Sequence, residues 1–151
     1  WAEDAATQAA IRSRLGWLTI PRTMARHTQS LGAFAEEVFE AGFTHVLLLG
    51  MGGSSLFAEV CRNTFSASRR HADLAVLDTT DPTAIRLHQR RCAPERLAVI
   101  VSSKSGTTAE IQALAAYFYG QLAAAGGAPG RVRPDGLRLR PPPGSRRARP
   151  A

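Results

Sequence analysis

The sequence lacks the residue patterns that build metal centres, disulfide frameworks or membrane spans. Its two cysteines, Cys61 and Cys92, form no CxxC pair and have no histidine at ligand spacing. We therefore expect buried free thiols and no metal site. No apolar run approaches the roughly 20 residues that a membrane helix needs. Residues 1–10 lack the basic start and continuous apolar segment of a secretory signal, so the expected location is cytoplasmic, without a membrane partner.

Acidic residues are scarce at the end of the chain, and this scarcity sets the net charge. After residue 125 there are seven arginines and one aspartate, whereas residues 1–125 hold 12 basic and 11 acidic residues. A formal charge of +7 would otherwise favour nucleic-acid binding. A nucleic-acid-binding arm on an unrelated fold is one interpretation of the tail, but the tail has no aromatic residue to stack on bases. We therefore expect no nucleic-acid partner.

Apolar runs typical of buried strands alternate with helical patterns in the middle of the chain. The runs lie at 45–49, 74–78 and 96–103, and each is followed by a segment with helical spacing. Two further helices are predicted upstream, over 3–15 and 23–42. This order predicts an α/β fold, a three-layer α/β/α sandwich with a parallel sheet of about three strands.

The last segment, residues 126–151, cannot build a core. It contains six of the nine prolines and no sustained hydrophobic period, so we expect it to be disordered. An authentic basic tail and a stretch translated out of frame from GC-rich DNA are the two interpretations, and the second is favoured because a fourth strand is due there. The expected organisation is a helical segment over 1–43, a partial α/β domain over 44–125 and the tail over 126–151.

The first strand leads into a glycine-rich turn, "LGMGGSS". Parallel α/β sheets bind ligands beyond the carboxyl ends of their strands. Gly53 with Ser54 could hold an anion there, since the following helix offers free N–H groups. A purely conformational turn is the alternative. A dinucleotide fingerprint with Asp78 as the ribose acid is another, but Ser55 stands where its third glycine belongs.

The second such turn, "SSKSGTT" at 102–108, follows the third strand and contains the only lysine of the chain. Hydroxyls, backbone N–H groups and an ammonium can converge there on one anion. A solvated turn that only caps the next helix is the alternative, and no Walker A order is present. The two turns favour a phosphorylated small molecule over a pyrophosphate. The candidate residues of the second turn are Ser103, Lys104, Ser105, Thr107 and Thr108.

The segments "LLLGMGGSSL", "VLDTTDP" and "VIVSSKSGTT" resemble, in order and spacing, the first sugar-isomerase domain of glucose-6-phosphate isomerase, which has a flavodoxin-like fold. "IRSRLGWLTIPRTM" and "FAEEVFEAGFTHV" look most like the bacterial form that is fused behind a transaldolase. The resemblance spans roughly residues 8–125. It implies that the candidate residues of both turns hold a sugar phosphate, and that the parent protein interconverts glucose 6-phosphate and fructose 6-phosphate without metal or organic cofactor.

The catalytic groups that the resemblance implies are absent from the matching segment. The family uses a glutamate base, an arginine and ring-opening histidine and lysine residues, all downstream of the point where this sequence departs from the pattern. Glu110 is interpreted as a first-turn acid that the helix dipole favours. We therefore expect an isomerase fragment that keeps the phosphate site. A sugar-phosphate-sensing domain of a regulator is the alternative, although no polar recognition helix precedes it.

Overall fold

The computed structural model describes residues 4–65 and 72–125, and the backbone of 131–132 and 138–139. The chain divides into two compact units, residues 1–35 and 36–151, and each is described by itself. Within the described ranges, no helix combines the length and apolar content needed to cross a bilayer.

The first unit consists of short helices: α1 (Ala5–Ser13), the 3-10 turn η1 (Gly16–Leu18), α2 (Ile20–Met24) and the beginning of α3 (Thr28–Glu40). Asp4 caps α1 by accepting a hydrogen bond from the Thr7 N–H at 2.7 Å. The prediction of one continuous helix over 23–42 is wrong in one respect, because the chain turns between α2 and α3. There the N–H groups of Arg26 and His27 donate three residues back, which closes α2 before α3 begins.

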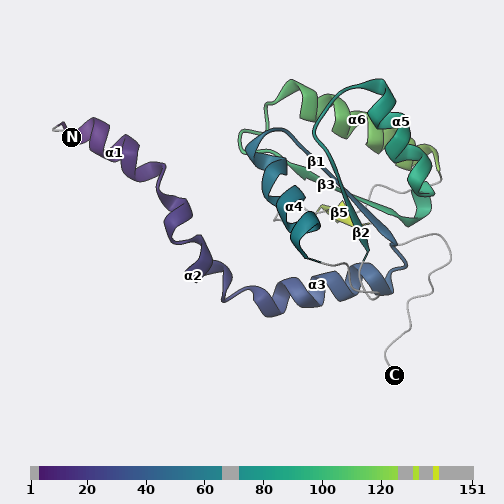
Figure 1. Ribbon diagram of the computed structural model, residues 1–151, viewed down its shortest axis with the longest axis horizontal. Coiled ribbons are helices and arrows are strands. Elements are labelled where there is room, and N and C mark those ends of the chain that lie inside the picture. Colours follow the sequence, from purple (N-terminus) through teal and green to yellow (C-terminus); the bar gives the residue numbers. More distant parts are fainter. Residues whose placement is uncertain (1–3, 66–71, 126–130, 133–137, 140–151) are drawn as a thin grey trace. The chain divides into compact units, whose positions relative to one another are not determined.

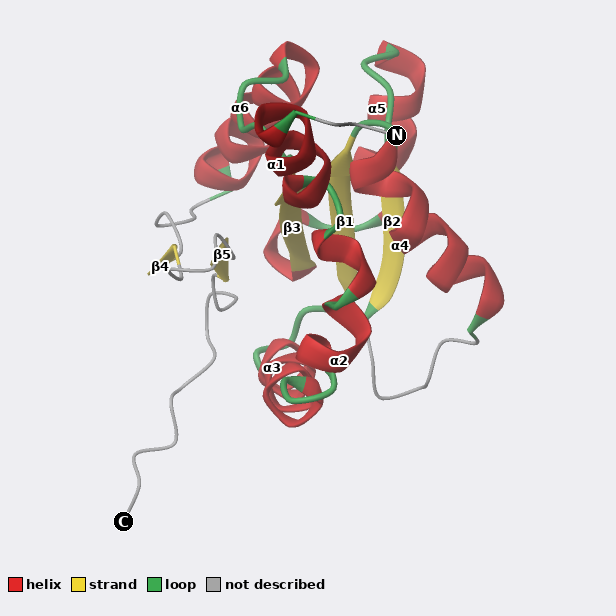
Figure 2. Ribbon diagram, turned by 90° about the vertical axis from the view of Figure 1, so that its left-hand side faces the viewer, coloured by secondary structure: helices red, strands yellow, loops and turns green. Residues whose placement is uncertain are grey.

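The second unit is built on a parallel sheet of three strands: β1 (His45–Gly50), β2 (Asp73–Leu77) and β3 (Leu97–Ser102). The strand order is β2-β1-β3, so β1 is central, as Figure 2 shows. In the register, Leu49 lies opposite Leu77 on one side and Val101 on the other. The prediction of an α/β fold with three parallel strands is confirmed.

Three helices cover the two faces of this sheet: α4 (Gly53–Thr64), α5 (Pro82–Arg91) and α6 (Ala109–Ala124), with the 3-10 turn η2 (Pro94–Arg96) before β3. The crossovers β1 to β2 and β2 to β3 run in opposite directions across the sheet, so right-handed connections put α4 and α5 on opposite faces. The Tyr117 hydroxyl of α6 donates to Gln89 Oε1 of α5 at 3.1 Å. α5 and α6 therefore share one face and α4 lies on the other (Figure 1).

The buried core lies between the sheet and α6. Leu47 and Leu49 of β1 are almost fully buried together with Leu77, Leu114 and Phe118. These strand residues are two apart and the helix residues are four apart, which are the periods that place side chains on one face of each element. Leu97 of β3 belongs to the same cluster and Val99 packs against it, so this core holds both β1 and β3, the strands from which the two turns start.

The outer face of α4 differs from this core. The helix is present where Leu56, Val60 and Phe65 predicted it, but these side chains are exposed, and the residue of α4 that is buried is Ser55. The prediction of buried thiols holds only in part, since Cys61 and Cys92 are free but half-buried. Partial burial raises the pKa of the Cys92 thiol.

Within residues 126–151 the structure describes β4 (Arg131–Val132) and β5 (Arg138–Leu139), which pair as an antiparallel two-residue ladder. The expectations of disorder and of an out-of-frame origin were made for the whole of residues 126–151, and the rest of this segment lies outside the described residues. Both expectations stay predictions.

Candidate phosphate-binding site

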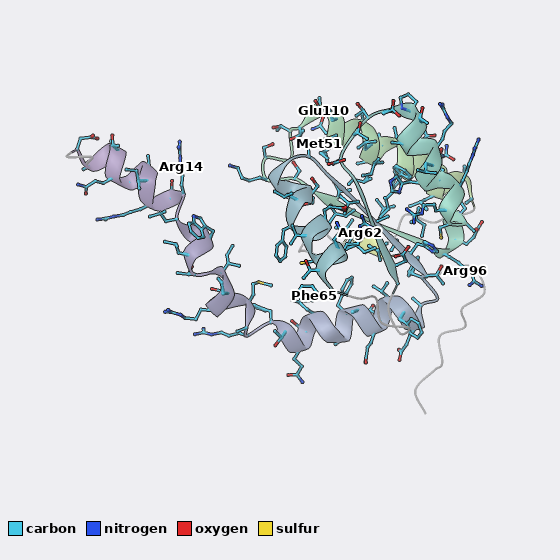
Figure 3. The ribbon with its side chains drawn as sticks, viewed as in Figure 1. Arg14, Met51, Arg62, Phe65, Arg96 and Glu110 are labelled. Carbon is cyan, nitrogen blue, oxygen red and sulfur yellow. The ribbon has the colours of Figure 1, made fainter. Side chains whose placement is uncertain are left out.

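The two predicted turns leave the sheet side by side. Gly50, the last residue of β1, is the register partner of Ser102, the last residue of β3. Neighbouring strands lie about 4.8 Å apart, so both turns start at one edge of the sheet. Figure 3 shows Met51 and Glu110, which follow the ends of β1 and β3, at that same end of the sheet.

Two glycines of the first turn are required by its geometry. A Cβ added at Gly50 would lie 2.9 Å from the backbone oxygen of Ser54 and 3.0 Å from its carbonyl carbon. Gly52 has φ 56° and ψ −123°, a conformation that residues with a Cβ rarely adopt. The conformational interpretation of the turn is therefore correct for these two positions.

Gly53 and Ser54 are under no such constraint. A Cβ at Gly53 would meet no atom within 4 Å, and its N–H donates no hydrogen bond to any described residue. The N–H of Ser54 donates to Met51 O at 3.2 Å. The residue is half-buried, and in the described part of the chain its hydroxyl makes no hydrogen bond. These two residues can offer one N–H and one hydroxyl to a ligand.

Ser55, which stands at the place of the third fingerprint glycine, has a structural role. Its side chain is buried, and its hydroxyl donates to Gly52 O at 2.9 Å. Its own N–H and that of Leu56 also donate to Gly52 O, each at 3.1 Å. Ser55 thus fastens the first turn of α4 to the glycine turn, and its hydroxyl is not available for a ligand.

The second turn contains a network of side-chain hydrogen bonds. Ser103 Oγ accepts from the Gly106 N–H at 3.0 Å, and Ser105 Oγ accepts from the N–H and the hydroxyl of Thr107 at 3.2 and 3.0 Å. Gly106 has φ 69°, which suits glycine. Because both serine oxygens act as acceptors in this network, each serine keeps its own hydroxyl proton for an external acceptor.

Lys104 and Thr108 complete the second turn. Lys104 is exposed, and among the described residues it has no ion-pair partner. Thr108 is the N-cap residue of α6, but its side chain makes no capping hydrogen bond. The alternative that this turn only caps the helix therefore lacks the bond that would support it.

The structure adds Gln112, which the sequence reasoning missed. Its side-chain Nε2 donates to Gly106 O at 3.0 Å from the first turns of α6. The signal available in the sequence was a glutamine six positions after the glycine of the turn, and this spacing alone does not specify a contact. Glu110, in the first turn of α6, is exposed, in agreement with its interpretation as a first-turn acid.

The helices that begin at the carboxyl edge of the sheet differ in how their N-termini are capped. α5 is capped by Asp81, whose carboxylate accepts from the N–H groups of Thr83 and Ala84 at 2.8 and 2.9 Å. α4 and α6 begin at Gly52 and Thr108 without a side-chain cap. An uncapped helix N-terminus leaves N–H donors and a partial positive charge for an anion. The two uncapped helices are those that follow the two predicted turns.

Asp78, the ribose acid of the dinucleotide interpretation, lines a hollow that includes no residue of the two turns. Asp78 is exposed, and this hollow of about 310 Å³ lies along the edge strand β2. The salt bridge between Glu59 and Arg62, with 2.6 Å between Oε1 and Nη2, lies at this hollow. The other residues that line the hollow are Ala75, Val76, His88 and Arg91.

The histidines form no catalytic arrangement in the described ranges. His45 Nδ1 lies 3.0 Å from the Thr44 hydroxyl. Partial burial, together with the charges of Arg91 and Arg62, lowers the pKa of His88. His27 lies in the first unit and His71 outside the described residues. In the part of the chain that the structure describes, no three His, Cys, Asp or Glu side chains could hold a metal ion.

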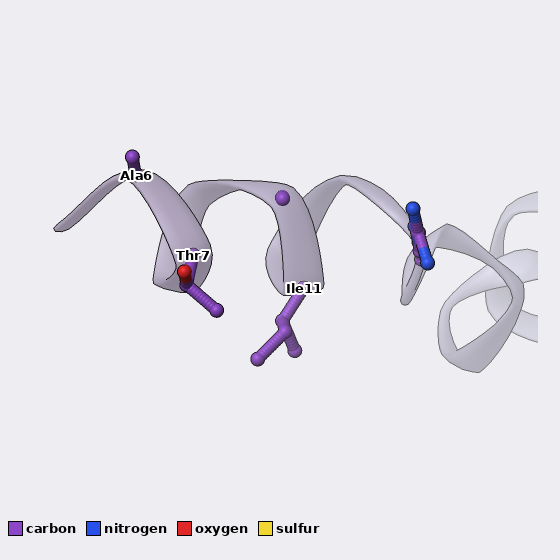
Figure 4. A pocket seen from close by; sticks show the side chains of 5 residues that line it. Ala6, Thr7 and Ile11 are labelled. Atoms are coloured by element: carbon purple, nitrogen blue, oxygen red, sulfur yellow. The ribbon is translucent and has the colours of Figure 1, made fainter. Parts of the chain in front are cut away.

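A hollow of about 430 Å³ in the first unit is lined by residues of one helix and its C-cap only (Figure 4). Ligand sites are concave and enclose most of the ligand, which one helix cannot do. We therefore assign no site to it. Its lining residues are Ala6, Thr7, Ala10, Ile11 and Arg14.

Comparison with known protein families identifies the chain. The family model described as phosphoglucose isomerase matches residues 22–133, which is most of the sequence and includes all three strands and both turns. The chain belongs to the phosphoglucose isomerase family. No curated protein and no solved structure matches it.

Membership of the phosphoglucose isomerase family confirms the expected resemblance at the level of the family. The matched segment differs in extent from the one read in the sequence, because it begins at residue 22 instead of 8 and continues past 125 to 133. The matched part of the last segment includes β4. Membership of this family implies an isomerase with a sugar-phosphate substrate.

Proposed function

We propose that the two turns bind the phosphate group of a sugar phosphate, and that the chain is part of an isomerase that interconverts glucose 6-phosphate and fructose 6-phosphate. The observation that carries this proposal is the difference in capping. Where α5 begins, the chain supplies its own carboxylate; where α4 and α6 begin, it supplies none. An external anion would take that place.

The proposed contacts divide between backbone and side chains. The Gly53 N–H and the Ser54 hydroxyl would donate from the first turn, and the Ser103 and Ser105 hydroxyls from the second. Lys104 would supply the only full positive charge. Thr108 would contribute its N–H and hydroxyl groups at the start of α6. Thr107, whose N–H and hydroxyl donate to Ser105 Oγ, would contribute through that serine. Together these groups suit one phosphate monoester, which accepts several hydrogen bonds and carries up to two negative charges.

The chemistry of the family moves a proton between C1 and C2 of the sugar through an enediol, and it needs a base beside the bound sugar. In this proposal the described turns hold the phosphate, and Glu110 stabilises the N-terminus of α6. This chain is therefore expected to bind the sugar phosphate and not to turn it over. We also propose that the protein is cytoplasmic and that it acts without an organic or metal cofactor. We further propose that its sugar-isomerase domain has the form that is fused to a transaldolase.

Calorimetric titration of the full chain tests the binding proposal. We expect fructose 6-phosphate to bind and fructose at the same concentration not to, because only the first ligand carries the anion. NAD should not bind measurably, since the place of the third fingerprint glycine is taken by the buried Ser55. Tight NAD binding would instead support the dinucleotide interpretation, and equal binding of fructose would show that the phosphate is not what the turns recognise.

A coupled isomerase assay on the same preparation tests the catalytic part. We expect no turnover above background. Turnover that Glu110→Gln abolishes would contradict the proposal and would make Glu110 the base. A sugar-phosphate sensor, the alternative function, would bind fructose 6-phosphate in the same way, so it is distinguished only by turnover in a longer protein that contains this chain.

A further inference from the structure

Gln112, which lies in α6, holds the peptide unit between Gly106 and Thr107 in the second turn. Its Nε2 donates to Gly106 O at 3.0 Å. The same peptide unit carries the N–H of Thr107, which donates to Ser105 Oγ at 3.2 Å. The unit is thus fastened at its carbonyl by α6 and at its N–H by the serine whose hydroxyl is a proposed phosphate ligand.

This peptide unit needs such a restraint because it follows a glycine. Gly106 has φ 69° and no Cβ, so rotation of the unit meets little steric resistance. Rotation by half a turn would exchange the directions of the carbonyl and the N–H. Ser105 Oγ would then face a carbonyl oxygen, which accepts hydrogen bonds and does not donate them. The serine proton would be drawn to that carbonyl and away from a ligand.

We propose that Gln112 is a positioning residue of the phosphate site: by holding the Gly106 carbonyl, it keeps the Ser105 hydroxyl free to donate to the phosphate of the sugar. Gln112 itself does not touch the ligand. The proposal rests on the proposed function of the two turns and adds a residue that acts through Ser105.

The test is a titration of the full chain with fructose 6-phosphate. Gln112→Met keeps the length of the side chain and removes the donor, and we expect about 3- to 10-fold weaker binding, the effect of one neutral hydrogen bond. Gln121→Met is the matched control, because Gln121 is also exposed on α6 and lies far along the helix from the turn. It should leave the affinity unchanged. Both variants should unfold at the temperature of the unmodified chain, since both side chains are exposed.

A double-mutant cycle with Ser105→Ala separates positioning from a general effect on the helix. If Gln112 acts through Ser105, Gln112→Met should weaken binding no further once the serine hydroxyl is gone. An equal loss in both backgrounds, or a Gln112→Met variant that binds like the unmodified chain, would overturn the proposal; Gln112→Ala provides a second variant should the first unfold. An unmodified chain that does not bind fructose 6-phosphate would refute the phosphate site itself, which is a distinguishable result.

Discussion

The two turns at the carboxyl edge of the sheet are built in different ways. The turn after β1 is shaped by its backbone: Gly50 allows the strand end and α4 to approach closely, and Gly52 adopts a conformation that other residues rarely take. The turn after β3 is shaped by side chains, with Ser103, Ser105 and Thr107 bonded to one another or to the backbone.

This difference separates the residues that determine the shape of the site from those that would bind the ligand. In the first turn, a substitution at Gly50 or Gly52 should damage the fold, because a Cβ at Gly50 would clash with the Ser54 carbonyl and because Gly52 has a positive φ. In the second turn, exposed polar groups carry the proposed ligand chemistry while the strand and helix around them hold the structure. Stability and binding should therefore respond to different substitutions.

The largest expected effect is on stability, from Gly50→Ala. The new methyl group would lie 2.9 Å from the Ser54 oxygen, a backbone atom that cannot move without shifting α4. We expect a loss of about 1–3 kcal/mol in the free energy of unfolding, as for other overpacked positions. Chemical denaturation measures it.

Gly53→Ala is the control for Gly50→Ala, because the methyl group would meet nothing within 4 Å. This variant should unfold at the midpoint of the unmodified chain or slightly above it, because alanine is favoured over glycine in a helix. Equal stability of the two variants would show that the strand end and the helix are free to separate, and the distinction between the two turns would be lost.

The next effect is on binding, from Lys104→Ala. Loss of a charged hydrogen bond should weaken fructose 6-phosphate binding by roughly 10- to 100-fold. The unfolding midpoint should not change, since Lys104 is exposed and has no ion-pair partner in the described residues. Arg90→Ala, which removes an exposed positive charge from α5, should leave the affinity unchanged. If both variants lose affinity equally, Lys104 acts only through the net charge.

Ser54 and Ser55, which are neighbours at the start of α4, allow residues for binding and for stability to be compared within one turn. Ser54→Ala should weaken sugar-phosphate binding by about 2- to 10-fold, the effect of one neutral donor, and leave the stability unchanged. Ser55→Ala should do the reverse, because it removes the buried hydroxyl that bonds to Gly52 O. Calorimetry and thermal unfolding of both variants check this. A stable Ser55→Ala variant with weakened binding would reverse the assigned roles.

The smallest expected effect is on the stability of the fold and concerns α5, the helix that Asp81 caps. Hydrogen bonds from the N–H groups of Ala84 and Thr83 lower the pKa of Asp81 below its ordinary value of 3.8. The folded state therefore favours the ionised carboxylate, and the resulting stabilisation is present above pH 4 and is lost as the pH falls through the lowered pKa.

Asp81→Asn tests the sign of this effect, since asparagine can cap a helix but does not ionise. Thermal midpoints should differ between the variant and the unmodified chain at pH 7, with the variant lower by a few degrees at most. The difference should shrink below pH 4. A difference that stays constant with pH would mean that the charge of Asp81 contributes nothing to stability.

Much of the fold could be predicted from the sequence because a strand buried on both faces needs a continuous apolar run. The runs at 45–49, 74–78 and 96–103 correspond to β1, β2 and β3. The break between α2 and α3 was missed, since "TMARHTQSL" contains no glycine or proline to mark it. The periodicity of α4 specified a helix but not which of its apolar side chains are buried, because that depends on the elements beside it.

The site was predictable where its chemistry is concentrated in short segments, as in "SSKSGTT". That both turns share one edge followed from the parallel sheet, but their direct adjacency depends on β1 being paired with β3. The contact from Gln112 to Gly106 could not be predicted, since a side-chain rotamer and the orientation of one peptide unit decide it. The absence of a side-chain cap on α6 likewise became evident only from the dihedral angles and hydrogen bonds of Thr108.

One measurement tests most directly whether the two turns form a single phosphate site. Amide spectra (¹H–¹⁵N) of the full chain would be recorded with and without fructose 6-phosphate, with fructose as the control ligand. We predict that the largest shifts fall on Gly53, Ser54 and residues 103–108, and that fructose causes none of them. Shifts confined to one turn, or centred on the hollow beside Arg62 and Arg91, would contradict a site shared by both turns.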